Sequence, residues 1–278
     1  MYLDHDSLVE AANQLPPLSN TVSELIRLFR NPDYKVEKVV KVVELDSSLT
    51  GMLLRLANSA VYGQPRTANA KTAIMRIGAG MVQAIAFASS VRPETKYDLS
   101  MFNLTIESYW HHTLFVTAFA EELATSNVAK FEDEFQMSAV IHDYGKLVMS
   151  KTVNDEHKKA MASLDPELPD YQKEFIVLGV NHAEVSAVVC QHWGMPDSLV
   201  HTVQFHHDPD QVATPEAYGL NLANHLAWRF AGDPRRNYVV ETESRHESID
   251  FFDLSDDQLA EVYNAGRDRC GALLDLFS

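Results

Sequence analysis

The chain has 278 residues, of which 46% are hydrophobic and 22% are charged. This composition excludes a wholly disordered chain, because enough apolar surface is present to offset the entropy lost on folding. The formal net charge of −16 also argues against non-specific electrostatic binding to nucleic acid or to an anionic membrane.

The two cysteines, Cys190 and Cys270, form no C-x-x-C pair and are expected to be free thiols in a reducing compartment. The N-terminus carries Asp4 and Asp6, where a signal peptide would need a basic start followed by an apolar stretch. No uncharged run reaches the roughly 18 residues of a membrane span. We therefore expect a cytoplasmic protein with neither nucleic acid nor membrane among its partners.

The first half of the chain shows a helical hydrophobic pattern. Apolar residues recur at i, i+3, i+4 and i+7 between Val36 and Val43 and again between Leu49 and Leu56, which places one apolar stripe on each of two helices. Between them, Asp46 offers a cap for the second helix. The uncharged segment from Ala79 to Val91 has the length of a buried helix.

Helix starts are equally clear in the second half. Thr214 offers a cap followed by Pro215 at the first helical position. Ser255 and Gln258 have capping-box spacing, and residues 255–278 are predicted to form a closing amphipathic helix. Only the stretch from Asn237 to Glu241 favours an extended conformation. The predicted fold class is therefore all-α.

A boundary between two helical subdomains is predicted within the stretch from Arg92 to Asn103, which contains Pro93 and a cluster of polar residues. The first subdomain would cover residues 1–95 and the second residues 96–278. Ten of the twelve histidines lie between His111 and His225, so any chemistry is expected in the second subdomain.

Several of these histidines are expected to face the protein interior. His112 begins an apolar helical series that ends at Leu123, and His182 begins a similar series. His206 and His207 are predicted to extend a helix with a further apolar face. The pair His142-Asp143 adds one more imidazole and a carboxylate to this set.

Five inward-facing imidazoles and an aspartate are hard to satisfy by hydrogen bonds alone. Such ligands suit divalent transition metal ions, namely Fe, Mn, Ni or Zn, and two adjacent ions would need about this many ligands. From the spacing alone, a site for one or two ions and a hydrogen-bonded histidine cluster both stay open.

The order of these residues resembles that of the HD superfamily of metal-dependent phosphohydrolases and of its HD-GYP branch of cyclic-dinucleotide phosphodiesterases. The chain is still more similar to the HDOD family, the HD-related output domains of bacterial signalling. The stretches that carry this similarity are Leu15-Pro16-Pro17-Leu18, Asp46 to Thr50, Leu53 to Gly63, Ala73 to Gly78, Gly179 to Val185 and Trp193 to Pro196.

The resemblance implies an HD-like helical bundle in the second half, and it implies a set of metal ligands. By position these are His112, His142, Asp143, His182, His206 and His207, with Asn224 in the seventh place. The late aspartate of the family pattern is replaced by Asn224, whose neutral amide would weaken the charge balance of the site. His225 follows, but it lies about 100° further round the helix and is expected to be a poor substitute.

The resemblance implies a regulatory or interaction module of bacterial signal transduction, with a degenerate metal site and a signalling protein as partner. Asn224 favours this hypothesis. The alternative is a metal-dependent phosphohydrolase acting on a nucleotide or a cyclic dinucleotide. In that case Asp143 and Lys146 would be catalytic, with Lys146 holding an oxygen of a phosphate-containing small ligand. A purely structural histidine cluster is the third hypothesis.

Overall fold

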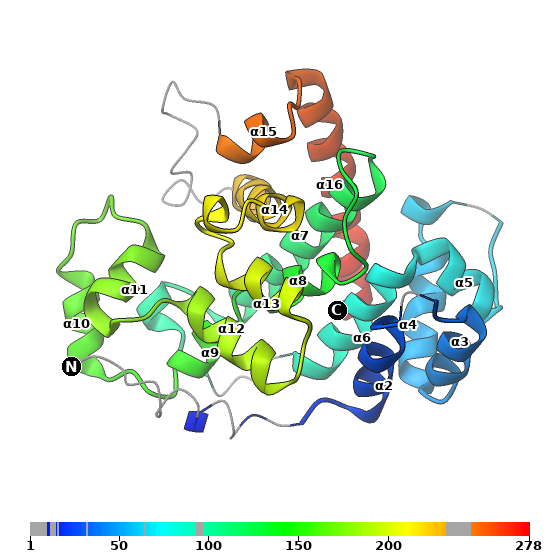
Figure 1. The fold of residues 1–278 in the computed structure, drawn as a ribbon, viewed down its shortest axis with the longest axis horizontal. Helices are drawn as coiled ribbons and strands as arrows, with labels where there is room; N and C mark the ends of the chain where they lie inside the picture. Colours follow the sequence, from blue (N-terminus) through cyan, green and yellow to red (C-terminus); the bar gives the residue numbers. More distant parts are fainter. Residues whose placement is uncertain are drawn as a thin grey trace.

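The structure is a computed structural model that describes residues 10–11, 15, 17–31, 33–63, 65–92, 97–231 and 246–278. Over these residues the chain forms α-helices and short 3-10 helices (η) and no strand, which confirms the predicted all-α class (Figure 1). In chain order the elements are α2 (Asn20–Phe29), α3 (Val36–Glu44), α4 (Ser47–Ala57), η1 (Ala60–Tyr62), α5 (Ala70–Ile77), α6 (Ala79–Val91), η2 (Ser100–Phe102), α7 (Ile106–Thr125), α8 (Phe135–Ile141), α9 (Tyr144–Met149), α10 (Asp155–Ala162), α11 (Asp170–Leu178), α12 (His182–His192), α13 (Asp197–Gln204), η3 (Pro209–Gln211), α14 (Pro215–Ala231), α15 (Glu247–Phe251) and α16 (Asp256–Phe277).

Side-chain caps begin several helices where the sequence predicts them. Asp46 accepts a hydrogen bond from the backbone N–H of Leu49 at 2.9 Å at the start of α4. Ser255 and Gln258 form the predicted capping box at the start of α16. Each cap satisfies an N–H group of the first helical turn, which has no acceptor within the helix.

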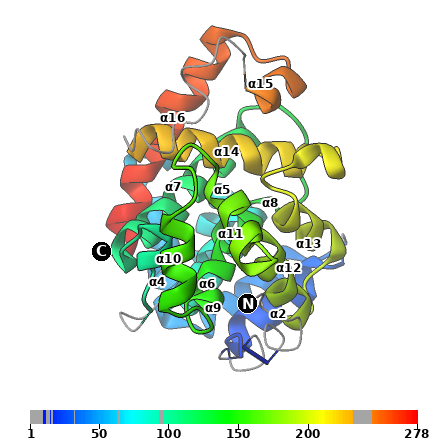
Figure 2. The ribbon, with the colours of Figure 1, turned by 90° about the vertical axis from the view of Figure 1, so that its left-hand side faces the viewer.

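Helix α7 forms the centre of the second half. It is buried along most of its length, and α8, α14 and α16 pack on it. In Figure 2, α14 lies across the bundle and α16 descends along one side of it. The closing helix predicted at the end of the chain is thus an integral part of the core.

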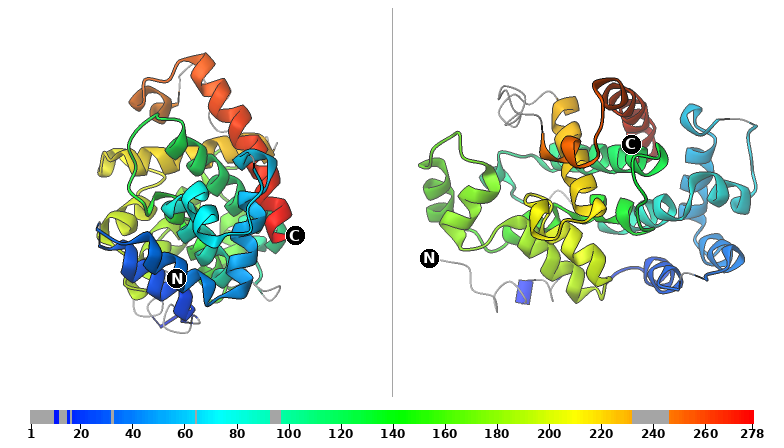
Figure 3. Two further views of the ribbon diagram at one scale, coloured as in Figure 1. Left: turned by 90° about the vertical axis from the view of Figure 1, so that its right-hand side faces the viewer. Right: turned by 45° about the horizontal axis from the view of Figure 1, so that its top comes forward.

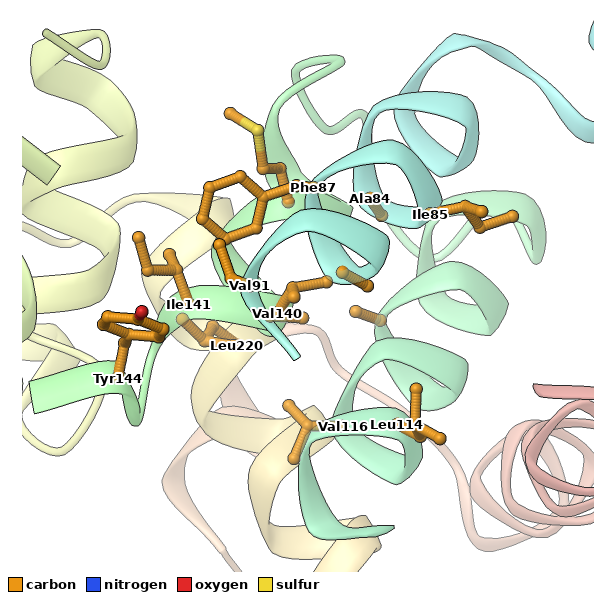
Figure 4. Packing of buried hydrophobic residues seen from close by; sticks show 14 of the residues in the cluster. Ala84, Ile85, Phe87, Val91, Leu114, Val116, Val140, Ile141, Tyr144 and Leu220 are labelled. Carbon is orange, nitrogen blue, oxygen red and sulfur yellow. The ribbon is translucent and has the colours of Figure 1, made fainter. Parts of the chain in front are cut away.

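The N-terminal helices share one hydrophobic core with this bundle. Helix α6 packs on α8, and α16 contacts α4 and η1 as well as α7; the left view of Figure 3 shows α16 beside the N-terminal helices. Figure 4 shows residues of α6 and α8, such as Phe87 and Val140, within the same cluster. The packing of α6 therefore couples the N-terminal helices to the element that leads into the His142-Asp143 pair.

The predicted subdomain boundary involves residues 93–96, which lie outside the described part of the chain, as do residues 237–241. The division into residues 1–95 and 96–278 stays a prediction.

The segment Ala79–Val91 forms the predicted buried helix, α6. Among the described residues, no single helix is long and apolar enough to cross a membrane, and only α5 and α6 together reach that composition, across a bend of 105°. Cys190 and Cys270 are buried and free, as predicted. Burial raises the pKa of the Cys270 thiol to about 12, so it stays protonated at neutral pH.

Candidate metal centre

The His142-Asp143 pair lies at the break between α8 and α9, and its side chains are 0% and 2% exposed. Helix α9 approaches α12 closely because residue 145 is glycine: a Cβ atom on Gly145 would lie 2.1 Å from the carbonyl oxygen of His182. The backbone N–H of Gly145 also donates to Ser186 Oγ at 2.7 Å. This close contact places Asp143 Oδ1 3.1 Å from His182 Nε2.

The remaining predicted ligands come from three other segments. His112 is buried on α7, and His182 is the first residue of α12. His206 and His207 do not extend helix α13, as the sequence analysis expected, because α13 ends at Gln204. The two histidines therefore lie in the turn after α13. Pro209 follows this turn and disfavours the helical conformation of Asp208, the residue before it.

The structure brings the predicted histidine and aspartate ligands together in two groups of three, which are His112, His142 and Asp143, and His182, His206 and His207. Within each group, one potential ligand atom of each residue lies within 4.8 Å of the others. The groups adjoin one another, because the ring centroids of His142 and His206 are 5.1 Å apart.

Backbone hydrogen bonds fix the orientation of two of the rings. His142 Nδ1 lies 2.8 Å from the carbonyl oxygen of Ala139, and His206 Nδ1 lies 2.7 Å from that of Val203. A carbonyl only accepts, so each Nδ1 carries the proton and each Nε2 carries a lone pair. Neither Nε2 has a hydrogen-bond partner within the described residues. A buried lone pair without a partner is unfavourable unless a cation or a donor occupies the site.

Electrostatics favour ligands in their metal-binding protonation states. Burial lowers the pKa of His142 and lowers that of His206 well below its usual value, so both rings are neutral at pH 7. Burial by itself would raise the pKa of Asp143, but the Lys146 ammonium and the hydrogen-bonded His182 outweigh it and hold that pKa well below the usual range. The Lys146 ammonium donates to Asp143 Oδ2 at 2.6 Å. Asp143 is therefore ionised, and its negative charge favours a cation beside it.

His182 has a different partner, which the sequence analysis missed. Burial lowers the pKa of His182, but Glu174 opposes this and, with Asp143, gives a net increase. Glu174 Oε2 lies 2.7 Å from His182 Nδ1, and Glu174 is fully buried on α11. Glu174 and Leu178 are four residues apart and form the buried face of α11, but the sequence alone does not show that this face, and not the one with Phe175 and Ile176, turns inward.

Two aromatic residues also contact the predicted ligands. Trp228 stacks on His112, with ring centroids 3.8 Å apart, and Tyr171 stacks on His207 at 4.4 Å. These rings restrict the orientation of the two imidazoles, because a stacked ring cannot turn without losing its contact.

A cavity of about 250 Å³ lies next to the ligands, and Lys146, His182, His207 and Asn224 are among the residues that line it. Asn224 is 8% exposed, and its Oδ1 atom has no hydrogen-bond partner in the described part of the chain. His225 lines the same cavity, and burial lowers the pKa of this histidine to about 3. The cavity is smaller than the roughly 300–1,000 Å³ of pockets for drug-sized ligands.

Comparison with known proteins identifies the family. A family model described as the HDOD domain matches residues 15–209. The chain belongs to the HDOD family. The match includes all of the predicted histidine and aspartate ligands and ends before Asn224. The HDOD chain thus has its ligand groups within the family segment and part of the adjoining cavity wall outside it.

A sequence relative and two solved structures are similar to this chain. An "Uncharacterized protein" of Treponema pallidum (strain Nichols) is 25% identical over 219 residues, covering 76% of this HDOD chain and 41% of that protein; the chain thus spans about two fifths of the relative's length. The structure of an HDOD domain protein with unknown function from Geobacter sulfurreducens has a TM-score of 0.69 at 19% identity, covering 98% of this chain and 99% of that one. A "Putative phosphohydrolase" from Shewanella amazonensis has a TM-score of 0.65 at 22% identity, with 96% and 98% covered. At these identities the structures show a common fold.

Proposed function

We propose that this HDOD chain is a metal-binding regulatory module of bacterial signal transduction, whose partner is a signalling protein. The observation that carries the proposal is the pair of buried Nε2 lone pairs, on His142 and His206, next to an ionised aspartate. In metal sites, a histidine commonly donates its other ring N–H to a carbonyl or carboxylate, which sets the tautomer and the ring orientation. The donor set of imidazoles and carboxylate fits one or two ions of Fe, Mn, Ni or Zn.

Asn224 supports a regulatory role over strong catalysis. Its side chain is a neutral amide at a buried position of the cavity wall, so it neither adds a negative charge to the site nor accepts a proton. A site that lacks this charge would hold its ion less tightly and would orient a nucleophile less well. The ion would then serve chiefly to hold α7, α9, α12 and the turn after α13 together.

A second candidate function is metal-dependent phosphohydrolysis of a nucleotide or cyclic dinucleotide. It is supported by Lys146, which is 5% exposed and faces both Asp143 and the cavity. There the ammonium would hold a phosphate oxygen. Asp143 would bind the metal ion and contact His182 of the second ligand group. A bound divalent ion would supply Lewis-acid activation and a water of lowered pKa.

Elemental analysis of the purified chain tests the metal site. The wild type is expected to hold about one or two equivalents of transition metal, and the His142→Ala/Asp143→Ala double variant is expected to hold none. His201→Ala is the matched control, because His201 is exposed on α13 and lies outside both ligand groups. Absence of metal from the wild type, even after incubation with Mn²⁺ or Fe²⁺, would contradict the proposal.

A screen of phosphomonoesters and phosphodiesters separates the two candidate functions. Turnover by the metal-loaded wild type, absent from the double variant, would replace the regulatory role with the enzymatic one. Turnover that appears only in Asn224→Asp would identify a site silenced by the amide.

A further inference from the structure

The carboxylate of Glu174 holds both the main chain and the ring of one predicted ligand. Glu174 is fully buried, one helical turn before α11 ends. Its Oε2 atom lies 2.7 Å from the backbone nitrogen of His182 and 2.7 Å from the ring Nδ1 of the same residue. The other carboxylate oxygen has no hydrogen-bond partner among the described residues, so the hydrogen bonding of this side chain is directed at His182.

The turn between α11 and α12 explains why this contact forms. Gly179 ends α11 with φ of 75°, a left-handed conformation that glycine adopts readily. Asn181 and Glu184 then form a capping box at the start of α12. His182 is the first residue of that helix, so its N–H group has no acceptor within the helix. Glu174 accepts from it, and the negative charge faces the positive end of the helix dipole.

The same contact determines which nitrogen of His182 faces the other ligands. A carboxylate only accepts, so the proton shared with Glu174 belongs to His182 Nδ1. The opposite nitrogen, Nε2, lies 3.1 Å from Asp143 Oδ1, to which it donates while no ion is bound, and 2.9 Å from His207 Nε2. His142 and His206 have neutral carbonyl partners, whereas His182 has an anionic one, which makes an imidazole a more strongly donating ligand.

We propose that Glu174 is the positioning residue of this site. It keeps the proton of His182 on Nδ1 and directs Nε2 at Asp143 and His207, and it acts through His182 without contacting a metal ion. This inference rests on the proposed function, because it assigns Glu174 a role in metal affinity.

Glu174→Ala and Glu174→Gln test the inference, with Glu184→Gln as the matched control. Glu184 accepts from the backbone N–H of Asn181 at the same helix end and forms no hydrogen bond with the ring of His182 among the described residues. In a titration with Co²⁺ followed by visible absorption, Glu174→Ala is expected to bind about 10- to 100-fold more weakly than the wild type. Glu174→Gln is expected to lie between them, because its amide oxygen still accepts from both N–H groups. Glu184→Gln is expected to keep wild-type affinity, because its amide oxygen still accepts from Asn181 and the substitution does not touch the ring of His182.

A second readout reports the tautomer directly. Long-range ¹H–¹⁵N spectra of histidine-labelled protein, recorded on metal-free and Zn²⁺-loaded samples, show which ring nitrogen is protonated. The Nδ1 proton of His182 is expected in the wild type and in Glu184→Gln, and the Nδ1 shift is expected to change in both Glu174 variants. The Gln variant keeps the test valid if Glu174→Ala does not fold.

The outcomes separate this inference from the proposed function. Absence of Co²⁺ binding by the wild type would overturn both. Wild-type Co²⁺ affinity in the Glu174 variants, together with an unchanged ¹⁵N pattern for His182, would overturn the inference and leave the metal site in place.

Discussion

Gly145 is the position at which a single methyl group should damage the candidate site most clearly. A Cβ atom there would lie 2.1 Å from the carbonyl oxygen of His182 and 2.8 Å from the backbone nitrogen of Ser186. Both are backbone atoms, so neither can rotate away. Ordinary contact begins at 3.4 Å, so α9 and α12 would have to separate by about 1.3 Å, from 2.1 to 3.4 Å. That separation would also lengthen the 3.1 Å contact between Asp143 and His182.

We expect Gly145→Ala to lower the free energy of unfolding by roughly 1–3 kcal/mol, the usual effect of overpacking. With a urea m-value of about 3 kcal/mol/M, the midpoint of unfolding would fall by roughly 0.3–1 M. Metal affinity of the folded variant should fall by at least about tenfold, since a ligand held out of place binds poorly.

Gly51→Ala is the control for this experiment. Gly51 lies within α4, and a Cβ atom there would meet nothing within 4 Å. Alanine at an exposed helix position is expected to stabilise the protein by about 0.5–1 kcal/mol. The reasoning would be refuted if Gly145→Ala were as stable as Gly51→Ala and bound metal as tightly as the wild type.

Three further predictions concern charge and metal binding. Asn224→Asp is expected to tighten Mn²⁺ binding about tenfold or more, measured by calorimetry, because it adds a negative charge to the cavity wall; unchanged affinity would place residue 224 outside the site. Burial raises the pKa of Glu121 from 4.5 to about 7, so the stability that this group contributes is fully present below about pH 4.5 and is lost as the pH rises through about 7. Urea unfolding between pH 5 and 8 should therefore show a steeper loss of stability in the wild type than in Glu121→Gln, and equal slopes would contradict this pKa. When the free metal ion is present at about 100 times its dissociation constant, its removal by a chelator should lower the unfolding free energy of the wild type by about 2.7 kcal/mol. The melting temperature should fall accordingly, and that of the His142→Ala/Asp143→Ala variant should not change.

The sequence predicts much of the fold and the identities of the clustered residues. Helical spacing and caps such as Asp46 and Ser255 are local signals, because a cap acts within one helical turn of its own backbone. The predicted histidine and aspartate ligands do come together in the structure. Their order along the chain and the family resemblance suffice to name them, although His206 and His207 lie in a turn and not on the predicted helix.

What only the tertiary structure decides is which partner each side chain meets. The pattern of α11 is misleading by itself: Phe175 and Ile176 are 54% and 49% exposed, while Glu174 is fully buried. The turn at Gly179 folds α11 back over the start of α12. The backbone N–H and the ring Nδ1–H of His182 then donate to the carboxylate of Glu174. Sequence periodicity predicts which residues share a face of a helix. Which face of a short helix is buried depends on the elements packed against it, and these lie elsewhere in the chain.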